Sequence, residues 1–449
     1  MSANERGTLG RRSLLAGLTG AGAVGALALG AGTAEAAAGT YVVDVLAKNA
    51  DPTGQTPSDQ AFKDAATELL ASFQPDPVSG AIPKKVLLIP PGNYLITQPD
   101  ALLPGIAGPG NGGIVDGIAI VGHGKRLSRI TYAPTVRNTT FWTNRDRYKN
   151  IRISGLTFDS RDATSTFNYA YSSDAGGVQD TWYTDVEWRG DWKAGIVLDG
   201  APDRAAGDKT SPQSDLNSEM GWDHCQVAGS YADAFLVMGA TPVASQQDQF
   251  LNMWFRDCKV EFKSGVFVRN ERGGSMNFTG GSYILTDTEA YGTFFKLGGT
   301  TGRADSVNRL YVQGIRFELR SDKHKVIDSA WYKGNITFVS CDDTALSFQG
   351  WATTAVATHV YRFDAVTPNR APMIRYQDCA LMGSHQVTTT SATTTGKLLY
   401  DGCRFSDANA ATGGTGATGG LLRWTGTAPW YEFRDCSAGA VRIPDVKGQ

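Results

Sequence analysis

The segment FRDCKV at residues 255–260 decides the fold, because its pattern returns throughout the chain. The pattern is an apolar residue, any residue, a turn-forming residue, cysteine, any residue and usually an apolar residue. All six cysteines occupy this position, the other five in WDHCQV (222–227), FVSCDD (338–343), YQDCAL (376–381), YDGCRF (400–405) and FRDCSA (433–438). Another residue replaces cysteine in ISGLTF (153–158), YTDVEW (183–188), FTGGSY (278–283) and VQGIRF (312–317). Ten copies at irregular spacing indicate a repeat protein with loops of variable length.

The turn-forming position and the segments after it predict the shape of one repeat. The position is mostly Gly or Asp, residues that tolerate the left-handed backbone of a sharp bend. A second short apolar strand follows most bends, at residues 195–200, 234–239, 265–270, 293–298, 345–350 and 420–426. We therefore predict an all-β chain, a single-domain parallel β-helix of about ten or more coils over residues 39–449. Residues 39–132 would form the N-terminal cap and first coils, and 133–449 the repeated coils.

Composition agrees with a solenoid and excludes some partners. The 449 residues include 53 glycines, 19% are charged, and the formal net charge is -2. A solenoid grows beyond the usual size of one domain because each coil packs only on its neighbours. The near-neutral charge argues against nucleic acid and anionic membrane surfaces as partners.

The first 38 residues have the features of an export signal. Arg11 and Arg12 precede an apolar run rich in Gly and Ala, and small residues near Ala36 offer a cleavage site. The arginine pair predicts the twin-arginine pathway, which exports folded proteins, and an ordinary secretory signal is the alternative. In both cases the mature chain is secreted or displayed at the cell surface, with no membrane segment.

The shared cysteine position argues against disulfides. Equivalent side chains of stacked coils run parallel about one strand spacing apart, wider than the Cβ separation of a disulfide. We therefore expect six buried thiols that pack as small hydrophobes. Parallel thiols do not form a tetrahedron, so we predict no metal site. No cofactor is firmly implied.

The mature N-terminus carries a family resemblance. Residues 41–54 (YVVDVLAKNADPTG) precede an amphipathic helix that Ser58 is expected to cap, and VLLIPPGNYLI (86–96) and IAIVGHG (118–124) follow. This order resembles the N-terminal region of the pectate-lyase-like superfamily of right-handed β-helices, with polygalacturonase-related hydrolases, polysaccharide lyases and phage tailspikes. The resemblance implies a right-handed solenoid, an extracellular polysaccharide as partner, and the possibility of an oligomer, since similar folds form trimers. Ca²⁺ would be needed only by a lyase.

Polar residues in and around the second strand are the candidate site, because the coil itself does not explain them. Asp199 and Asp233 lie on neighbouring coils and could supply the two carboxylates of a glycoside hydrolase. Arg269 could instead be the base of a lyase. Glu271, Arg272 and Lys296 are expected to bind substrate. The adjacent Asp342 and Asp343 look like a polygalacturonase acidic pair, but neighbouring strand residues point to opposite faces.

Two polar inserts at residues 159–181 and 201–220 are expected to wall the groove. They would bring Glu219 to the substrate, and Trp192 nearby would offer an aromatic platform for a sugar ring. We predict an exported polysaccharide-active enzyme, with hydrolysis favoured over β-elimination because acids outnumber cations at the start of the groove. A non-catalytic glycan-binding protein, like a tailspike, is the alternative.

Overall fold

The structure is a computed structural model and describes residues 40–71, 84–103, 115–145, 148–172, 178–200, 217–239, 250–271, 273–298, 308–343, 357–363, 372–389, 396–405, 414–415, 421–438, 440–443 and 445–448. Residues 41–449 form one compact unit. The expected export signal lies outside the described residues.

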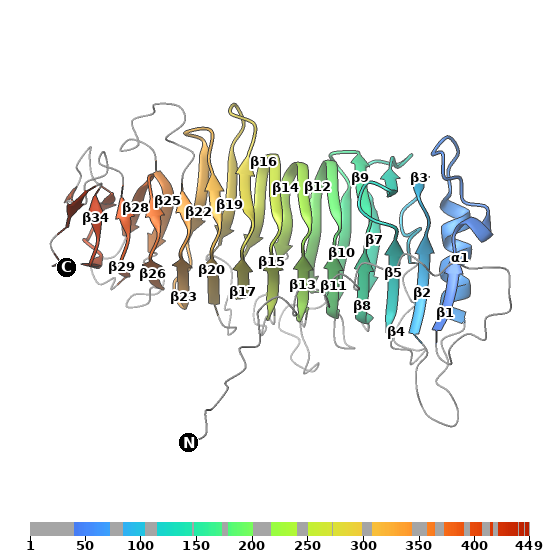
Figure 1. The fold of residues 1–449 in the computed structure, drawn as a ribbon, viewed down its shortest axis with the longest axis horizontal. Coiled ribbons are helices and arrows are strands. Elements are labelled where there is room, and N and C mark those ends of the chain that lie inside the picture. The colour runs from blue at the N-terminus through green and yellow to red at the C-terminus, as the bar shows by residue number, and fades with distance from the viewer. Residues whose placement is uncertain are drawn as a thin grey trace, which may run out of the picture. The chain divides into compact units, whose positions relative to one another are not determined.

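Two sheets of parallel strands make up this unit (Figure 1). Sheet A has 15 strands, namely β1 (Thr40–Asp44), β2 (Lys84–Ile89), β4 (Val115–Asp116), β5 (Ile118–Gly122), β8 (Tyr148–Ser154), β11 (Gln179–Thr184), β13 (Met220–Asp223), β15 (Met253–Arg256), β17 (Gly274–Thr279), β20 (Asn308–Gln313), β23 (Asn335–Val339), β26 (Met373–Gln377), β29 (Lys397–Asp401), β33 (Trp430–Arg434) and β36 (Val446–Gly448). Each strand pairs with the equivalent strand of the next coil, and only the last pair, β33 with β36, is antiparallel.

Sheet B has 21 strands in two rows. The first row holds β3 (Gly92–Ile96), β6 (Ser128–Tyr132), β9 (Thr157–Arg161), β18 (Ser282–Leu285), β21 (Arg316–Glu318), β24 (Asp342–Asp343), β27 (Ala380–Leu381), β30 (Arg404–Phe405), β34 (Ser437–Ala438) and β35 (Val441–Arg442). The second row holds β7 (Thr140–Arg145), β10 (Thr166–Ser172), β19 (Gly292–Leu297), β22 (His324–Ser329), β25 (Ala357–Phe363), β28 (Ser384–Thr389), β31 (Gly414–Thr415) and β32 (Leu422–Thr425). Three long strands run through both rows: β12 (Glu187–Gly200), β14 (Gln226–Met238) and β16 (Lys259–Asn270).

The bend between sheet A and sheet B confirms the predicted repeat. All ten turn-forming residues have φ between 47° and 67°, the left-handed region that the repeat pattern requires. The apolar residue that opens each segment lies in one unbroken register from Ile153 to Phe433. The parallel β-helix predicted from the sequence is therefore confirmed.

The six cysteines form the expected buried ladder. Each is at most 3% exposed, and all are free thiols. The Sγ atoms donate to carbonyl oxygens of the preceding coil, as from Cys258 to Trp222 at 3.4 Å. Burial raises the pKa of the Cys225 thiol well above its usual value, so the thiol stays protonated.

The second strand was predicted less well. The segments at 195–200, 234–239, 265–270, 293–298 and 420–426 fall in the second row of sheet B. The segment at 345–350 lies outside the described residues, and β22, β25 and β28 continue the row. These strands carry buried His324, His359 and His385, which weakened their apolar pattern.

The N-terminal helices are short, and one covers the first coil. They are η2 (Leu46–Lys48) and α1 (Asp59–Ala71), which lies at the N-terminal end of the stack (Figure 1). Phe62 and Leu69 of α1 are fully buried, as the amphipathic pattern predicted. Ser58 accepts through its carbonyl from Phe62, but its hydroxyl accepts from the Asp51 amide instead of capping α1. The buried Lys85 ammonium donates to the Leu69 carbonyl at 3.2 Å near the end of the helix.

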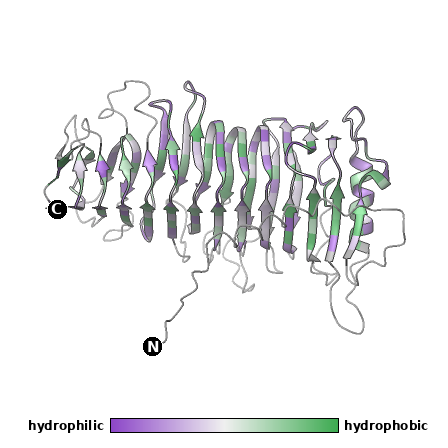
Figure 2. Cartoon of the chain, in the orientation of Figure 1, coloured by the Kyte–Doolittle hydropathy of each residue, from purple (hydrophilic) through white to green (hydrophobic). Residues whose placement is uncertain are grey.

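Hydrophobic and hydrophilic residues are interspersed along the strands, as Figure 2 shows. Inward residues of both sheets make one continuous hydrophobic core. Outward residues of equivalent coils form columns, so a functional surface is assembled from residues tens of positions apart.

Candidate functional site

A column of charged side chains follows the outer face of the second row of sheet B. Register pairs place Arg269 beside Lys296 and Lys296 beside Asp328 on successive coils. We call this column, with Asp233 and Glu271 next to Arg269, the charged strip. Four of the predicted site residues therefore lie on this face, namely Asp233, Arg269, Glu271 and Lys296.

Arg269 joins two carboxylates at one end of the strip. Its Nη1 lies 2.7 Å from Asp233 Oδ1, and its Nε lies 3.4 Å from Glu271 Oε1. All three side chains are partly open to solvent, with exposed fractions of 25%, 27% and 27%. Because both carboxylates contact one guanidinium, their oxygens are no more than about 8 Å apart, which overlaps the spans of retaining and inverting glycosidases.

The other end of the strip is a second ion-pair cluster. Asp328 contacts Arg362 from the next coil and lies 3.6 Å from Lys325 Nζ on its own strand. Lys296 is exposed between the two clusters and has no ion pair among the residues that the structure describes. Lys296 is therefore the cation of the strip that is most available to a ligand.

The structure corrects the expectation that Asp199 faces an open groove. Asp199 is only 1% exposed, although it lies at the end of β12 next to the predicted site. It pairs with Tyr171 of β10, and its carbonyl accepts from Asn217 Nδ2 at 2.9 Å. The neighbouring strand β10 and the segment that begins at Asn217 both lie against Asp199. Of the two carboxylates predicted as a pair, only Asp233 is open to solvent.

Trp192 was predicted wrongly as a sugar platform. Its side chain is fully buried, stacked on Tyr132 with ring centroids 6.3 Å apart, and its Nε1 donates to the Arg189 carbonyl. Trp192 lies four residues after the inward-facing Trp188, so an alternation of two along β12 places both indoles on the inner face.

The two remaining substrate-binding residues are not in the strip as described. Glu219 has φ of 59° at the bend that leads into sheet A, and its Oε1 accepts from Asn252 Nδ2. Arg272 lies outside the described residues, as does most of the insert at 201–220. The structure therefore brings Glu219 to sheet A, away from its predicted partners.

The adjacent acids Asp342 and Asp343 point to opposite faces, as predicted. Asp342 is exposed, whereas Asp343 is 1% exposed. Burial raises the pKa of Asp343 to about 6, opposed by hydrogen bonds from the Gly383 amide and the Thr358 hydroxyl. The two carboxylates cannot act on one substrate.

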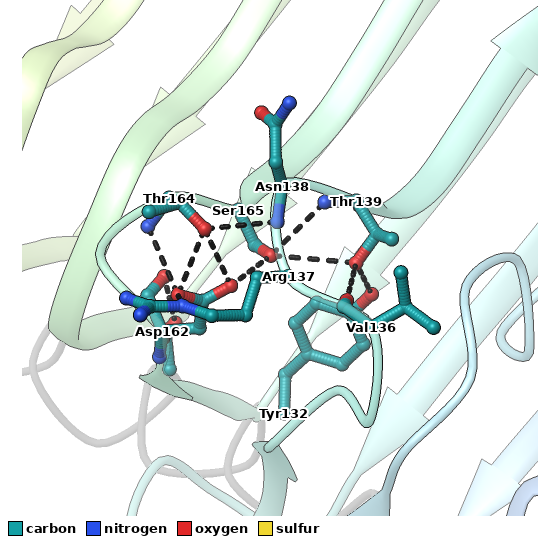
Figure 3. Close-up of polar contacts among 9 residues, drawn as sticks. Tyr132, Val136, Arg137, Asn138, Thr139, Asp162, Thr164 and Ser165 are labelled. Carbon is teal, nitrogen blue, oxygen red and sulfur yellow. Dashed lines mark hydrogen bonds and ion pairs between the residues drawn. The ribbon is translucent and has the colours of Figure 1, made fainter.

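The insert at 159–181 is mostly regular structure, because β9 and β10 occupy much of it. Asp162 anchors the turn between these strands, as Figure 3 shows. Its carboxylate accepts from Ser165 Oγ at 2.7 Å and from Thr164 Oγ1 at 2.9 Å, and Arg137 Nε lies 3.3 Å away. Burial opposes ionisation, but these hydrogen bonds lower the pKa of Asp162 to about 2. Asp162 therefore has a structural role.

Sequence reasoning missed the outward-facing indoles of Trp182 and Trp254 on sheet A. Both are half-buried, and each directly precedes a residue of the inward column, Tyr183 or Phe255. Alternation along a strand would have placed both side chains on the outer face. The repeat pattern identifies only the inward column and not the outward residues beside it.

Two kinds of feature are absent from the residues that the structure describes. No helix there is long and apolar enough to cross a membrane. No group of three or more His, Cys, Asp or Glu side chains within the described ranges is placed to hold a metal ion.

Comparison with known proteins adds support for the fold. The sequence matches no protein-family model and no curated protein sequence. The crystal structure of the Agl-KA catalytic domain matches with a TM-score of 0.52 and 11% identity, over 88% of this chain and 68% of that chain. At this identity the likeness shows a shared fold alone.

Two other solved structures match at lower TM-scores. The catalytic unit of the thermostable GH87 α-1,3-glucanase from Streptomyces thermodiastaticus strain HF3-3 has a TM-score of 0.39 and 14% identity, over 91% of this chain and 73% of that chain. The hyperthermoactive exopolygalacturonase from Thermotoga maritima has a TM-score of 0.38 and 8% identity, over 91% of this chain and 94% of that chain.

Proposed function

We propose that this parallel β-helix is an exported protein that binds a polysaccharide and hydrolyses it at the charged strip. The observation that carries the proposal is the pair of carboxylates, Asp233 and Glu271, that contact one guanidinium on a partly open outer face. Two carboxylates on either side of a glycosidic bond are what hydrolysis requires. The Arg11 and Arg12 pair supports export through the twin-arginine pathway.

The two contacts with Arg269 suggest different roles for the carboxylates. Asp233 lies closer to the guanidinium, at 2.7 Å, and is assigned as the base or nucleophile. Glu271 is held more loosely, at 3.4 Å, and would donate the proton to the leaving oxygen. Arg269 fits less well as the base of a lyase, because two carboxylates already contact its guanidinium.

The same contacts favour a second candidate, a non-catalytic glycan-binding protein. Asp233, Glu271 and Asp328 each have a cationic partner, so the strip also resembles a structural ion-pair network. Substrate would have to displace or share these partners. A strip that only holds coils together would leave the chain able to bind a glycan without cleaving it.

A comparison of three carboxylate variants tests the proposal. We expect Asp233→Asn and Glu271→Gln each to lower turnover by about 10²- to 10⁴-fold, the range of an acid–base contribution. Asp342→Asn is the matched control, since this carboxylate is exposed and lies outside the strip. It should keep turnover within about twofold, and all three should keep the wild-type Tm within a few degrees.

The products separate the alternatives. Purified full-length protein would be incubated with neutral and acidic polysaccharides, with and without EDTA, and assayed for reducing ends and for the ultraviolet absorbance of unsaturated ends. New reducing ends without that absorbance indicate hydrolysis. Unsaturated ends indicate a lyase, and their loss in EDTA would point to Ca²⁺. Wild-type activity in Asp233→Asn and Glu271→Gln would remove the charged strip from the chemistry.

A further inference from the structure

Two tryptophans on the outer face of sheet A flank a glycine on three successive coils. Register pairs place Trp182 beside Gly221 and Gly221 beside Trp254. The indoles stack across the intervening coil, with ring centroids 5.7 Å apart and an interplanar angle of 15°. Five other tryptophans, Trp142, Trp188, Trp192, Trp222 and Trp331, are less than 2% exposed, whereas these two are half-buried.

Gly221 makes this arrangement possible by leaving room for an indole. A Cβ atom built on Gly221 would lie 2.2 Å from Trp182 Cε3 and 2.3 Å from Cζ3, so no other residue fits beneath the ring. Along the coil axis, the column therefore has a large side chain, no side chain and a large side chain in turn. We call Trp182, Gly221 and Trp254 the tryptophan platform.

Polar groups hold the platform in place and surround it. Trp182 Nε1 donates to Asp180 Oδ1 at 3.1 Å, and Arg152 Nη2 contacts both oxygens of the same carboxylate at 3.0 Å. The Arg256 guanidinium lies over the Trp182 ring, 5.0 Å from its centroid. Asp223 is the register neighbour of Arg256 on the same face. Two arginines and two aspartates thus leave the surroundings close to neutral.

We infer that the tryptophan platform is a second glycan-binding site, which takes pyranose rings of a neutral polysaccharide. Sugar rings have apolar faces edged by hydroxyls, and indoles with a few fixed polar groups match both parts of that surface. The balanced charge favours a neutral glycan over an acidic one. Two rings offer much less area than a stable protein partner needs, which argues against a protein as the occupant.

The platform is built on sheet A and the charged strip on sheet B, so binding at one need not involve residues of the other. The inference rests on the proposed function for the class of ligand, a polysaccharide. It adds that the polysaccharide is neutral and that a second site binds it away from the reaction.

Affinity electrophoresis and tryptophan fluorescence titration with soluble neutral glucan, xylan and mannan test the inference. We expect Trp182→Ala and Trp254→Ala each to weaken binding about tenfold or more, as for a central aromatic contact. Trp182→Phe should keep part of the affinity, and Gly221→Ala should lose it because the new Cβ displaces the Trp182 ring. Tyr311→Ala is the matched control, since Tyr311 is a half-buried aromatic two coils beyond Trp254 in the same column.

The expected result includes a Tyr311→Ala protein that binds as wild type. Wild-type affinity in both tryptophan-to-alanine variants would overturn the inference, as would an equal loss in Tyr311→Ala, binding of acidic polysaccharides such as pectate alone, or no binding of any neutral glycan. The double variant Asp233→Asn with Glu271→Gln should still bind. If wild type binds through the platform but cleaves nothing, the proposed hydrolysis fails and the platform stands. If wild type cleaves and the tryptophan variants bind and cleave equally well, only the platform fails.

Discussion

The core changes in chemistry between its middle coils and its C-terminal coils, although one register runs through both. In the middle coils Trp222 stacks on Phe255 with ring centroids 4.2 Å apart, and Phe255 on Phe278 at 4.7 Å. The second row of sheet B adds Phe295 and Ile327 to this apolar interior. Packing there depends on shape and on removal of apolar surface from water.

In the C-terminal coils the same inward column continues with histidine. Register pairs lead from Ile327 to His359 and on to His385, whose rings are 4.2 Å apart. His385 Nδ1 lies 2.9 Å from the Tyr400 hydroxyl, and the Tyr361 and Tyr376 hydroxyls contact each other. Burial lowers the pKa of His359 to about 3 and that of His385 well below its usual value, so both rings are neutral near pH 7.

The coil backbone therefore accepts either an apolar or a polar interior, the latter with partners such as the Tyr400 hydroxyl for His385. An apolar coil loses stability when volume is removed. A polar coil loses stability when a charge is created or a partner is lost. The two regions should therefore fail under different conditions.

The largest expected effect is in the middle coils. Trp222→Ala removes a fully buried side chain from the ring stack and should lower the free energy of unfolding by about 3–5 kcal/mol. Tyr376→Phe, the comparison in the C-terminal coils, loses one hydroxyl contact and should cost about 0.5–1.5 kcal/mol. Urea unfolding of both variants measures the difference. Equal losses would show that the two regions do not differ as described.

The pH dependence of stability should come partly from Asp343. Its folded-state pKa of about 6 is above the unfolded value of 3.8, so the folded state holds the proton more tightly. The stability that this provides is complete below about pH 4 and is lost as pH rises to about 6, by roughly 3 kcal/mol. Asp343→Asn should therefore gain stability relative to wild type across this window and show a constant difference above it.

Asp342→Asn is the control for that series, because Asp342 is the exposed neighbour on the opposite face. Each variant differs from wild type at one carboxyl group only, so the difference between the curves isolates that group. Urea unfolding at several pH values between 4 and 7.5 gives the curves. Parallel curves for Asp343→Asn and wild type would mean that the carboxyl group is not buried as described.

The smallest expected effect concerns the cysteines, which span both regions. Thiol titration of the purified protein under denaturing conditions should find six free groups, because all six cysteines are free and the spacing of stacked side chains is wider than the Cβ separation of a disulfide. Reductant should then leave the Tm unchanged. Fewer than four free thiols, or a lower Tm in reductant, would contradict the ladder of buried free thiols.

The repeat itself was determined by the sequence. A left-handed bend followed by a buried small side chain is a local requirement, so the residues from Gly155 to Asp435 predicted the register of sheet A. The same locality predicted buried thiols and the amphipathic helix α1 at the N-terminal end. The charged strip was found in part, since Arg269 and Lys296 break an apolar strand pattern that their neighbours keep.

Tertiary structure decided the rest. Whether Asp199 meets solvent depends on which chain segments pass over it. The stack of Trp182 on Trp254 needs a third coil that supplies Gly221 between them. Repeat patterns predict what each coil does alone, whereas pairing of charges and stacking of rings arise only between coils, from residues that are distant in the sequence.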